Sequence, residues 1–522
     1  MVGTADFPLT VAAIDVGTNA IRFVAAEFVD RTHWIQKESV RIPVRLGHQA
    51  FLTGRLAEDA MAGAVEAMAT FRRSLDTHGV VEYRAVATSA VRESRNGGDL
   101  VERIRAETGI RLETITGSEE ARLTWVAAST RVSMDHHRWM MADLGGGSLE
   151  ISTASSEGVE WIESHTMGTV RVLEELGAEA EDQEALRELV VEYAARLRLP
   201  DWILEEKPPL NGFMATGGNI EALAELAGCD PDGKGVARLP VPKLEKWIDR
   251  LARISVEERI ERFGFRQDRA DVILPAAILY HRVAQLAGAE TILVPNLGVK
   301  EGVLVDLVDD LVRPQVHASR RGEEALRGAL ALGRRFQFDE AHGDHVAHLA
   351  MSLFDQLVPL HGLGEVERRI LASAAALHDI GQFLSHRKHH KHSLYIIKNS
   401  ELPGFSRSEV PLVALVARYH RRAEPKDSHY LYEDLSREDR NRVGRLGAIL
   451  RLADALDREH LQRVTSVEVR EGDGEWVVEA RGRGDLRLER WAFDKKSGMF
   501  ETIFGVPARL ELSAESGVLR RG

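Results

Sequence analysis

The chain has 522 residues, too many for one hydrophobic core, so its length predicts several domains. Its hydrophobic content of 44% and charged content of 29% are ordinary for a soluble globular protein. The net charge of -13 argues against a protein that coats nucleic acid, and a single cysteine excludes an intramolecular disulfide and a cysteine-rich zinc site.

The N-terminal segment lacks a basic stretch followed by a long apolar core, so we expect no signal peptide. The chain also lacks an uninterrupted apolar run of about 18 residues, so we expect no membrane span. Together with the scarcity of cysteine, these features favour a cytoplasmic protein.

Residues 1–130 show an alternation of strand and helix patterns that is typical of an α/β lobe. The expected elements, in chain order, are strands at 11–16 and 21–26, a helix at 57–78, a strand at 83–88, a helix at 98–108 and a strand at 111–116.

Two short motifs combine an apolar strand, an acid, small residues and a hydroxyl. In the first, Asp15 precedes Gly17, Thr18 and Asn19, and in the second, Asp143 precedes the run Gly145, Gly146, Gly147 and Ser148. The acid can hold a divalent cation, and the small residues let backbone N–H groups approach an anion. Each motif alone could be only a tight turn, but the pair predicts a cleft that holds a metal and a phosphate chain.

The segment 131–312 repeats this order and predicts a second α/β lobe that faces the first. Strands are expected from 138 to 143, at 149–152 and at 212–215. The last of these strands leads to Gly217 and Gly218, which either end the strand or meet a phosphate chain.

From about residue 313 the strand patterns vanish, and amphipathic helices are expected to residue 463. Alternation returns in the tail, so 464–522 is expected to form a small α+β domain. The segment 312–315, which contains Pro314, is the best candidate for a hinge.

The motifs resemble those of the exopolyphosphatase and guanosine pentaphosphate phosphohydrolase (Ppx/GppA) family of the actin-like ATPase superfamily. The resemblance implies two actin-like, ribonuclease H-like lobes around a cleft. It rests on the two turns above and on five further segments: Ala87-Thr88-Ser89-Ala90-Val91-Arg92, Gly117-Ser118-Glu119-Glu120-Ala121-Arg122, His165-Thr166-Met167-Gly168 with Arg171, Ala215-Thr216-Gly217-Gly218, and Lys300-Glu301-Gly302.

The resemblance also implies roles for single residues. Glu120 matches the water-activating glutamate of the family, although its position also suits a carboxylate at a helix start. Glu150 matches a further acid near the metal, or it is a surface residue of a strand. Arg92 presents a planar fork for phosphate oxygens, or it forms a surface salt bridge. Asp15 and Asp143 are the expected partners of Mg²⁺, or of Mn²⁺ in its place.

Residues 313–463 resemble an HD domain, the fold of many metal-dependent phosphohydrolases. In long family members this region is credited with dimerisation and substrate binding, which implies a homodimer. Imidazole and carboxylate together suit a transition metal. The matching residues are His342, His378, Asp379, His392, His420 and Asp454, whereas His345, His386, His389 and His390 are expected on the surface.

A basic run lies within this helical region of an otherwise acidic chain. Arg387, Lys388 and Lys391 carry it, and Arg421 and Arg422 add to it. Such a run is either a solvated face or a guide for a polyanion.

The leading hypothesis is a magnesium-dependent exopolyphosphatase, which removes terminal phosphate from inorganic polyphosphate. The alternative is hydrolysis of guanosine pentaphosphate in the same cleft. Two further alternatives are a sensor that binds polyphosphate or guanosine polyphosphates without turnover, and an HD phosphohydrolase with a regulatory N-terminal half. No nucleic acid or membrane partner is expected.

Overall fold

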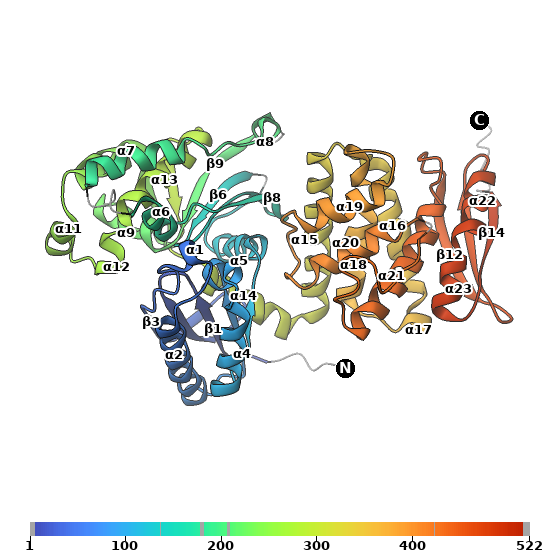
Figure 1. Cartoon of the computed structure of the whole chain (residues 1–522), viewed down its shortest axis with the longest axis horizontal. Coiled ribbons are helices and arrows are strands. Elements are labelled where there is room, and N and C mark those ends of the chain that lie inside the picture. The colour runs from blue at the N-terminus through green and yellow to red at the C-terminus, as the bar shows by residue number, and fades with distance from the viewer. Residues whose placement is uncertain (1–5, 136, 178–181, 206–208, 422, 515–522) are drawn as a thin grey trace. The chain divides into compact units, whose positions relative to one another are not determined.

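The computed structural model describes residues 6–135, 137–177, 182–205, 209–421 and 423–514. Residues 1–5 of the N-terminal segment and Arg422 of the basic group lie outside the described residues. The chain divides into two compact units, Met1–His317 and Ala318–Gly522 (Figure 1). This division lies inside one helix, shortly after the expected hinge at 312–315.

The first unit contains two mixed β-sheets. The first sheet has the strand order β3-β2-β1-β4-β5, with β1 and β2 antiparallel and β1 and β4 parallel. Strand β3 was not expected, because its outward face is polar and lacks a clear alternation. The strands are β1 (Leu9–Val16), β2 (Ile21–Phe28), β3 (Trp34–Ile42), β4 (Glu82–Ala87) and β5 (Leu112–Thr114).

Strand β1 is buried on both faces because helices cover both sides of this sheet. Ala12 and Ile14 face a core shared with α2 and α4, which lie along the first sheet in Figure 1, whereas Val11 and Ala13 face a core shared with α14. The helices of this lobe are α1 (Ala50–Thr53), α2 (Glu58–Thr77), α3 (Ser89–Glu93) and α4 (Gly97–Thr108).

The second sheet has the strand order β10-β11-β9-β6-β7-β8. Its strands are β6 (Arg138–Leu144), β7 (Leu149–Ser155), β8 (Gly158–His165), β9 (Leu210–Thr216), β10 (Ala237–Pro240) and β11 (Thr291–Val294). The surrounding helices are α6 (Thr169–Leu176), α7 (Gln183–Ala194), α8 (Asp201–Glu205), α9 (Gly218–Leu226), α10 (Val241–Ala252), α11 (Val256–Phe263), α12 (Gln267–Ala270) and α13 (Ile273–Leu286).

The two sheets repeat one local design. Strands β1 and β2 pair antiparallel so that Asp15 lies opposite Arg22, and strands β6 and β7 pair antiparallel so that Asp143 lies opposite Glu150. In both sheets the strand that carries the aspartate also pairs in parallel with a neighbour, β4 or β9. Each aspartate therefore stands at the strand end that precedes the small-residue turn.

Helices α5 (Gly117–Ser129) and α14 (Val299–Val312) connect the two lobes. Trp125 of α5 packs into the core of the second sheet, whereas Leu123 packs with α14 against the first. A Cβ atom on Gly302 would lie 1.9 Å from the Leu123 carbonyl oxygen, so only glycine allows this approach. Helix α14 thus packs on the first lobe, although the sequence placed it in the second.

The second unit is helical until residue 463, as the loss of strand patterns predicted. Its core includes small and aliphatic residues from the central helices, such as Ala347, Ala375 and Val413. The helices are α15 (Pro314–Arg335, which begins in the first unit), α16 (Glu340–Gln356), α17 (Val358–His361), α18 (Glu365–Leu377), the short 3₁₀ helix η2 (Ile380–Phe383), α19 (His389–Lys398), α20 (Val410–Arg418) and α21 (Arg437–Ala455).

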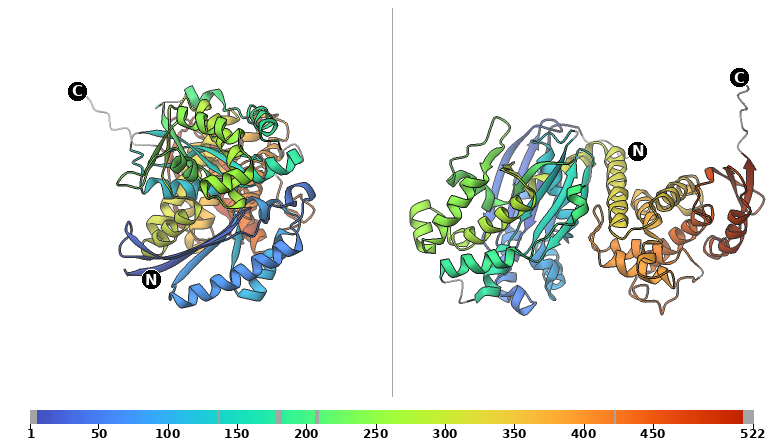
Figure 2. Two further views of the ribbon diagram at one scale, coloured as in Figure 1. Left: turned by 90° about the vertical axis from the view of Figure 1, so that its left-hand side faces the viewer. Right: turned by 90° about the horizontal axis from the view of Figure 1, so that it is seen from above.

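The C-terminal segment forms a sheet with the strand order β12-β13-β14. Val478 of this sheet and Phe493 and Phe500 of its helices join the core of the helical region, so the segment expected as a separate domain shares one core with it. The ribbon of this segment, in red, lies beside the helices of the same unit in Figure 2. Its elements are β12 (Val464–Glu471), β13 (Trp476–Gly482), α22 (Arg487–Lys496), α23 (Gly498–Phe504) and β14 (Ala508–Ala514).

Among the described residues, no helix combines the length and the apolar character that crossing a membrane requires.

Candidate active site

A polar cavity of about 220 Å³ lies between the two lobes of the first unit. Both small-residue turns, the start of α5 and the ends of β1, β6 and β9 line it. The predicted residues that line the cavity are Asp15, Gly17, Thr18, Asn19, Glu120, Asp143, Gly145, Gly146, Gly217 and Gly218.

The two aspartates are held by different partners. Arg22 Nη1 donates to Asp15 Oδ2 at 3.0 Å. The hydroxyl groups of Thr216 and Thr124 donate to the two oxygens of Asp143, at 3.0 and 3.2 Å. Burial raises the pKa of Asp143, while these two hydrogen bonds oppose the rise. These partners fix the orientation of both carboxylates in the cavity.

Glu120 is buried in the first turn of α5, where the Thr116 side chain caps the helix. Burial raises the pKa of Glu120 well above its ordinary value, and the charge of Glu150 adds to that rise. Arg92 Nη1 lies 3.4 Å from Glu120 Oε2 and opposes the rise. A carboxyl group with a raised pKa in a cleft is suited to accept a proton near neutral pH.

Glu150 and Arg92 lie behind Glu120 and do not line the cavity. Glu150 is 1% exposed, and its Oε1 lies 3.9 Å from Arg92 Nη2 and accepts a hydrogen bond from Ser164 at 2.9 Å. Burial raises the pKa of Glu150 to about 7. The alternatives of a surface strand residue for Glu150 and a surface salt bridge for Arg92 are therefore wrong.

The second turn is closed by its own backbone, since Gly145 N–H donates to the Ser148 carbonyl at 3.0 Å. The predicted residues Gly147 and Ser148 do not line the cavity. A Cβ atom on Gly168 would lie 2.3 Å from the backbone of Gly146 and Gly147, so the following segment packs directly on this turn. In the first turn, the Thr18 hydroxyl shares a hydrogen bond of 3.0 Å with Ser89.

Four cations line the same cavity, and Sequence analysis assigned no role to any of them: Arg22, Arg41, Arg269 and Lys300. Arg22, Arg41 and Lys300 form ion pairs with neighbouring acids, whereas Arg269 forms none within the described residues. Of these four cations, only Lys300 belongs to a motif identified in the sequence. The other three are distant in sequence, and the closure of the lobes brings them together.

The second unit brings most of the predicted histidines and aspartates into one cluster. His342 Nε2 and His378 Nε2 are 3.2 Å apart, and Asp454 Oδ1 lies 3.7 Å from His378 Nε2 and 4.0 Å from His342 Nε2. Lys496 pairs with the other oxygen of Asp454. Burial lowers the pKa of His378 to about 4, so its imidazole is neutral at neutral pH.

A second group adjoins the first through Asp379. Its Oδ1 atom lies 3.0 Å from His389 Nε2 and 3.3 Å from His420 Nε2. His389 was expected on the surface and His392 in the cluster, but the groups that the described residues form contain His389 and not His392. The start of α19 places His389 toward Asp379, and His392 lies almost one turn further along the helix.

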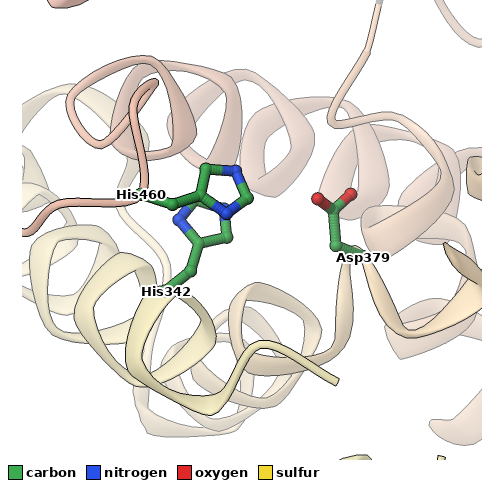
Figure 3. A group of neighbouring side chains, drawn as sticks. All are labelled: His342, Asp379 and His460. Carbon is green, nitrogen blue, oxygen red and sulfur yellow. The ribbon is translucent and has the colours of Figure 1, made fainter. Parts of the chain in front are cut away.

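His460 joins this cluster without any signal in the sequence. Its ring stacks on His342 with the centroids 3.5 Å apart, and its Nδ1 atom lies 2.9 Å from Asp339 Oδ2. Figure 3 shows the two rings one over the other, with Asp379 across the site from them. His460 has a positive φ of 59° in the loop after α21, a position that no motif could identify.

Residues 27–311 match the model of the Ppx/GppA phosphatase family, and residues 326–481 match the model of Ppx/GppA phosphatase, domain III. Exopolyphosphatase 1 of Mycobacterium leprae (strain TN) is 27% identical over 342 residues, which cover 62% of this chain and 97% of the relative.

Two solved structures are similar to part of the chain. An exopolyphosphatase from Cytophaga hutchinsonii is 27% identical with a TM-score of 0.54, and the match covers 57% of this chain and 98% of that one. An exopolyphosphatase-like protein is 25% identical with a TM-score of 0.51, and the match covers 57% of this chain and 97% of that one. Because one family model spans more than half of its length, the chain belongs to the Ppx/GppA phosphatase family.

Proposed function

We propose that this protein is an exopolyphosphatase of the cytoplasm that acts as a homodimer. The proposal rests on one observation: four acids converge at one cavity, and they are Asp15, Asp143, Glu120 and Glu150. The two small-residue turns and four cations line the same cavity. The similarity to two exopolyphosphatases, in Mycobacterium leprae and Cytophaga hutchinsonii, supports the same substrate class.

The reaction uses water and the residues of the cleft. A water oxygen attacks the terminal phosphorus while Glu120 takes a proton from that water. The bond between the phosphorus and the bridging oxygen breaks, and a chain shorter by one phosphate leaves with that oxygen. Backbone N–H groups of the two turns and the guanidinium of Arg269 are the donors for the phosphate oxygens, and Arg92 holds Glu120 in place.

The donor set of the cleft fits Mg²⁺ or Mn²⁺, since it consists of carboxylate and hydroxyl oxygens. Asp15 and Asp143 are the residues that would hold the ion. A bound ion would neutralise charge on the phosphate oxygens.

Hydrolysis of guanosine pentaphosphate in the same cleft remains the alternative. None of the described residues that line the cavity is aromatic, so the cavity offers no ring on which a guanine base could stack. This feature favours inorganic polyphosphate. Phosphate release from long polyphosphate and from guanosine pentaphosphate, measured side by side with Mg²⁺, decides between them, and binding of either one without turnover would instead support a sensor.

The first prediction concerns the base. Glu120→Gln should keep the binding of polyphosphate but lower turnover by on the order of a hundredfold or more, because the amide cannot take the water proton. Phosphate release and polyphosphate binding are measured on the same samples. Glu102→Gln, on the exposed face of α4, is the matched control. Near-normal turnover in Glu120→Gln would remove Glu120 from this role.

The second prediction concerns pH. Glu120 acts only when deprotonated, so activity should rise with pH through its raised pKa. The negative charge of Glu150 raises that pKa and the positive charge of Arg92 lowers it. Glu150→Gln should therefore move the acid limb of the kcat/KM profile to lower pH, and Arg92→Gln should move it to higher pH. Shifts in one common direction would contradict this electrostatic arrangement.

The third prediction concerns the metal. Asp143→Ala should lower Mg²⁺-dependent turnover by about a hundredfold or more, because the cation loses a carboxylate partner. Activity is measured over a range of Mg²⁺ concentrations, with the exposed Asp99→Ala as control. Full activity of Asp143→Ala at ordinary Mg²⁺ would show that Asp143 only ends a strand.

We also propose that the helical region has an HD-like fold and binds a transition metal. The support is the convergence of His342, His378, Asp379, His420 and Asp454, with His389 in the place expected for His392. Imidazole and carboxylate groups suit manganese, iron, zinc or nickel. These residues belong to another unit than the cleft and require no contribution from it.

The basic run is the proposed guide for polyphosphate. Arg387, Lys388 and Lys391 are exposed, and none has an ion pair within the described residues. They flank or occupy the start of α19, where the helix dipole is already positive and adds to the attraction for an anion.

The fourth prediction tests this guide. Neutralising Arg387, Lys388 and Lys391 to glutamine should lower activity on long polyphosphate severalfold, while activity on short chains changes little, and added salt should mimic the substitution. The control neutralises three exposed cations elsewhere in the unit, Lys426, Arg437 and Arg490. Equal losses on long and short chains would show that the run is only a solvated face.

A further inference from the structure

Two neighbouring ion pairs join the two lobes of the first unit. Arg41, near the end of β3, pairs with Asp268 of α12. Arg45, in the loop after β3, donates from Nη2 to Asp271 Oδ2 at 2.6 Å. Arg41 and Asp268 line the cavity of the cleft, whereas Arg45 and Asp271 do not. Only the first pair therefore lies where a substrate in the cavity can reach it.

The ion pair with Asp268 leaves part of the Arg41 guanidinium unsatisfied. Nη2 donates to Asp268 Oδ2, but Nη1 is buried and has no hydrogen-bond partner within the described residues. A buried donor without an acceptor lowers the stability of the folded protein, because water no longer solvates it. An oxygen of a bound anion would supply the missing acceptor.

Positive charge is concentrated around Arg41. Burial lowers the pKa of Arg41, Asp268 opposes the fall, and the charges of Arg266 and Arg22 add to it. Burial and the same two charges lower the pKa of Arg269, which also lines the cavity. Guanidinium groups that repel one another in this way are suited to the several negative charges of a phosphate chain.

Asp268 has other partners that hold it in place. Its Oδ1 atom lies 3.5 Å from Arg266 Nε. Its backbone carbonyl accepts a hydrogen bond of 2.8 Å from Asn19 Nδ2, in the first small-residue turn. Arg41 can therefore exchange Asp268 for another anion while Asp268 keeps its position and a neighbouring positive charge.

Within the described residues, Arg41 forms no hydrogen bond or ion pair with Asp15, Asp143 or Glu120. These three residues act on the terminal phosphate in the proposed reaction. Arg41 would then meet a phosphate further along the chain, where no bond breaks. A contact of that kind strengthens the binding of the substrate and leaves the chemical step unchanged.

We propose that Arg41 is a substrate-binding residue for polyphosphate, and that Asp268 occupies its guanidinium until a phosphate chain replaces it. The inference rests on the proposed exopolyphosphatase function. Oxygens of a phosphate beyond the terminal one accept hydrogen bonds from Nη1 and Nη2 of Arg41. Binding thus exchanges an ion pair between the lobes for one with the substrate, while Arg45 and Asp271 still join the lobes.

The experiment measures binding and turnover separately. The dissociation constant of long polyphosphate is measured with the full chain in the Glu120→Gln background, in which turnover is blocked. KM and kcat are measured for the same substrate without that substitution. Arg45→Gln is the matched control, because it removes the same charge from the neighbouring ion pair outside the cavity.

The two partners of the ion pair should give opposite results. Arg41→Gln should raise the dissociation constant and KM about tenfold at constant kcat, because the chain loses charged donors. Asp268→Asn should lower the dissociation constant about threefold, because the amide competes less for Arg41. Arg45→Gln should change either constant by less than about twofold. Misfolding does not explain tighter binding, so Asp268→Asn keeps the test sharp if Arg41→Gln folds poorly.

A double substitution separates competition from a general effect of charge. Asp268→Asn removes a negative charge from the cavity, which by itself favours a polyanion. In the proposal the gain depends on Arg41, so Asp268→Asn should leave the dissociation constant unchanged in the Arg41→Gln background. A gain of about threefold that persists there would overturn the competition between Asp268 and the substrate.

The remaining contrary results are distinct. Weaker binding in both Arg41→Gln and Asp268→Asn would overturn the inference, because the pair would then be only a structural link between the lobes. An unchanged dissociation constant in Arg41→Gln would also overturn it, whereas the exopolyphosphatase activity of the parent would stand. Absence of phosphate release by the parent would overturn the proposed function, and the dissociation constants would still decide the role of Arg41. A parent chain that binds no polyphosphate would overturn both.

Discussion

The structure depends on the burial of like charges at the cleft between the two lobes. Asp15, Glu120 and Glu150 are buried and Asp143 is partly buried, and burial raises the pKa of Asp143, Glu120 and Glu150. Burying such a group of negative charges lowers the stability of the folded protein unless cations neutralise them. Arg22 and Arg92 supply part of that charge from the protein. A divalent cation is the natural complement for the remaining negative charge.

Helix α5 is the element that makes this concentration possible. It presents Glu120 in its first turn, buries Trp125 in the second lobe and buries Leu123 in the first. A buried ion pair of 2.9 Å between Arg122 and Asp306 fixes it to α14. Because Gly302 lets the two helices touch, α5 and with it Glu120 are held close against α14. The position of Glu120 in the cavity therefore depends on how the two lobes pack against α5.

The two units gather different kinds of potential ligand atoms. The cleft offers oxygen ligands and backbone amides, which suit Mg²⁺ and a chain of phosphates. The helical unit offers five imidazole groups and two carboxylates, which suit softer divalent ions.

The sequence by itself determined the α/β repeat, the helical region after residue 313 and the two aspartate turns, because strand periodicity and small-residue turns are local properties. It also singled out Glu120, Asp379 and most histidines by their motifs. Only the tertiary structure decided that α14 packs on the first lobe, that Arg269 enters the cleft, and that His389 and His460 join the cluster while His392 stays apart. These outcomes depend on helix rotation, loop geometry and contacts between distant segments, which no local pattern encodes.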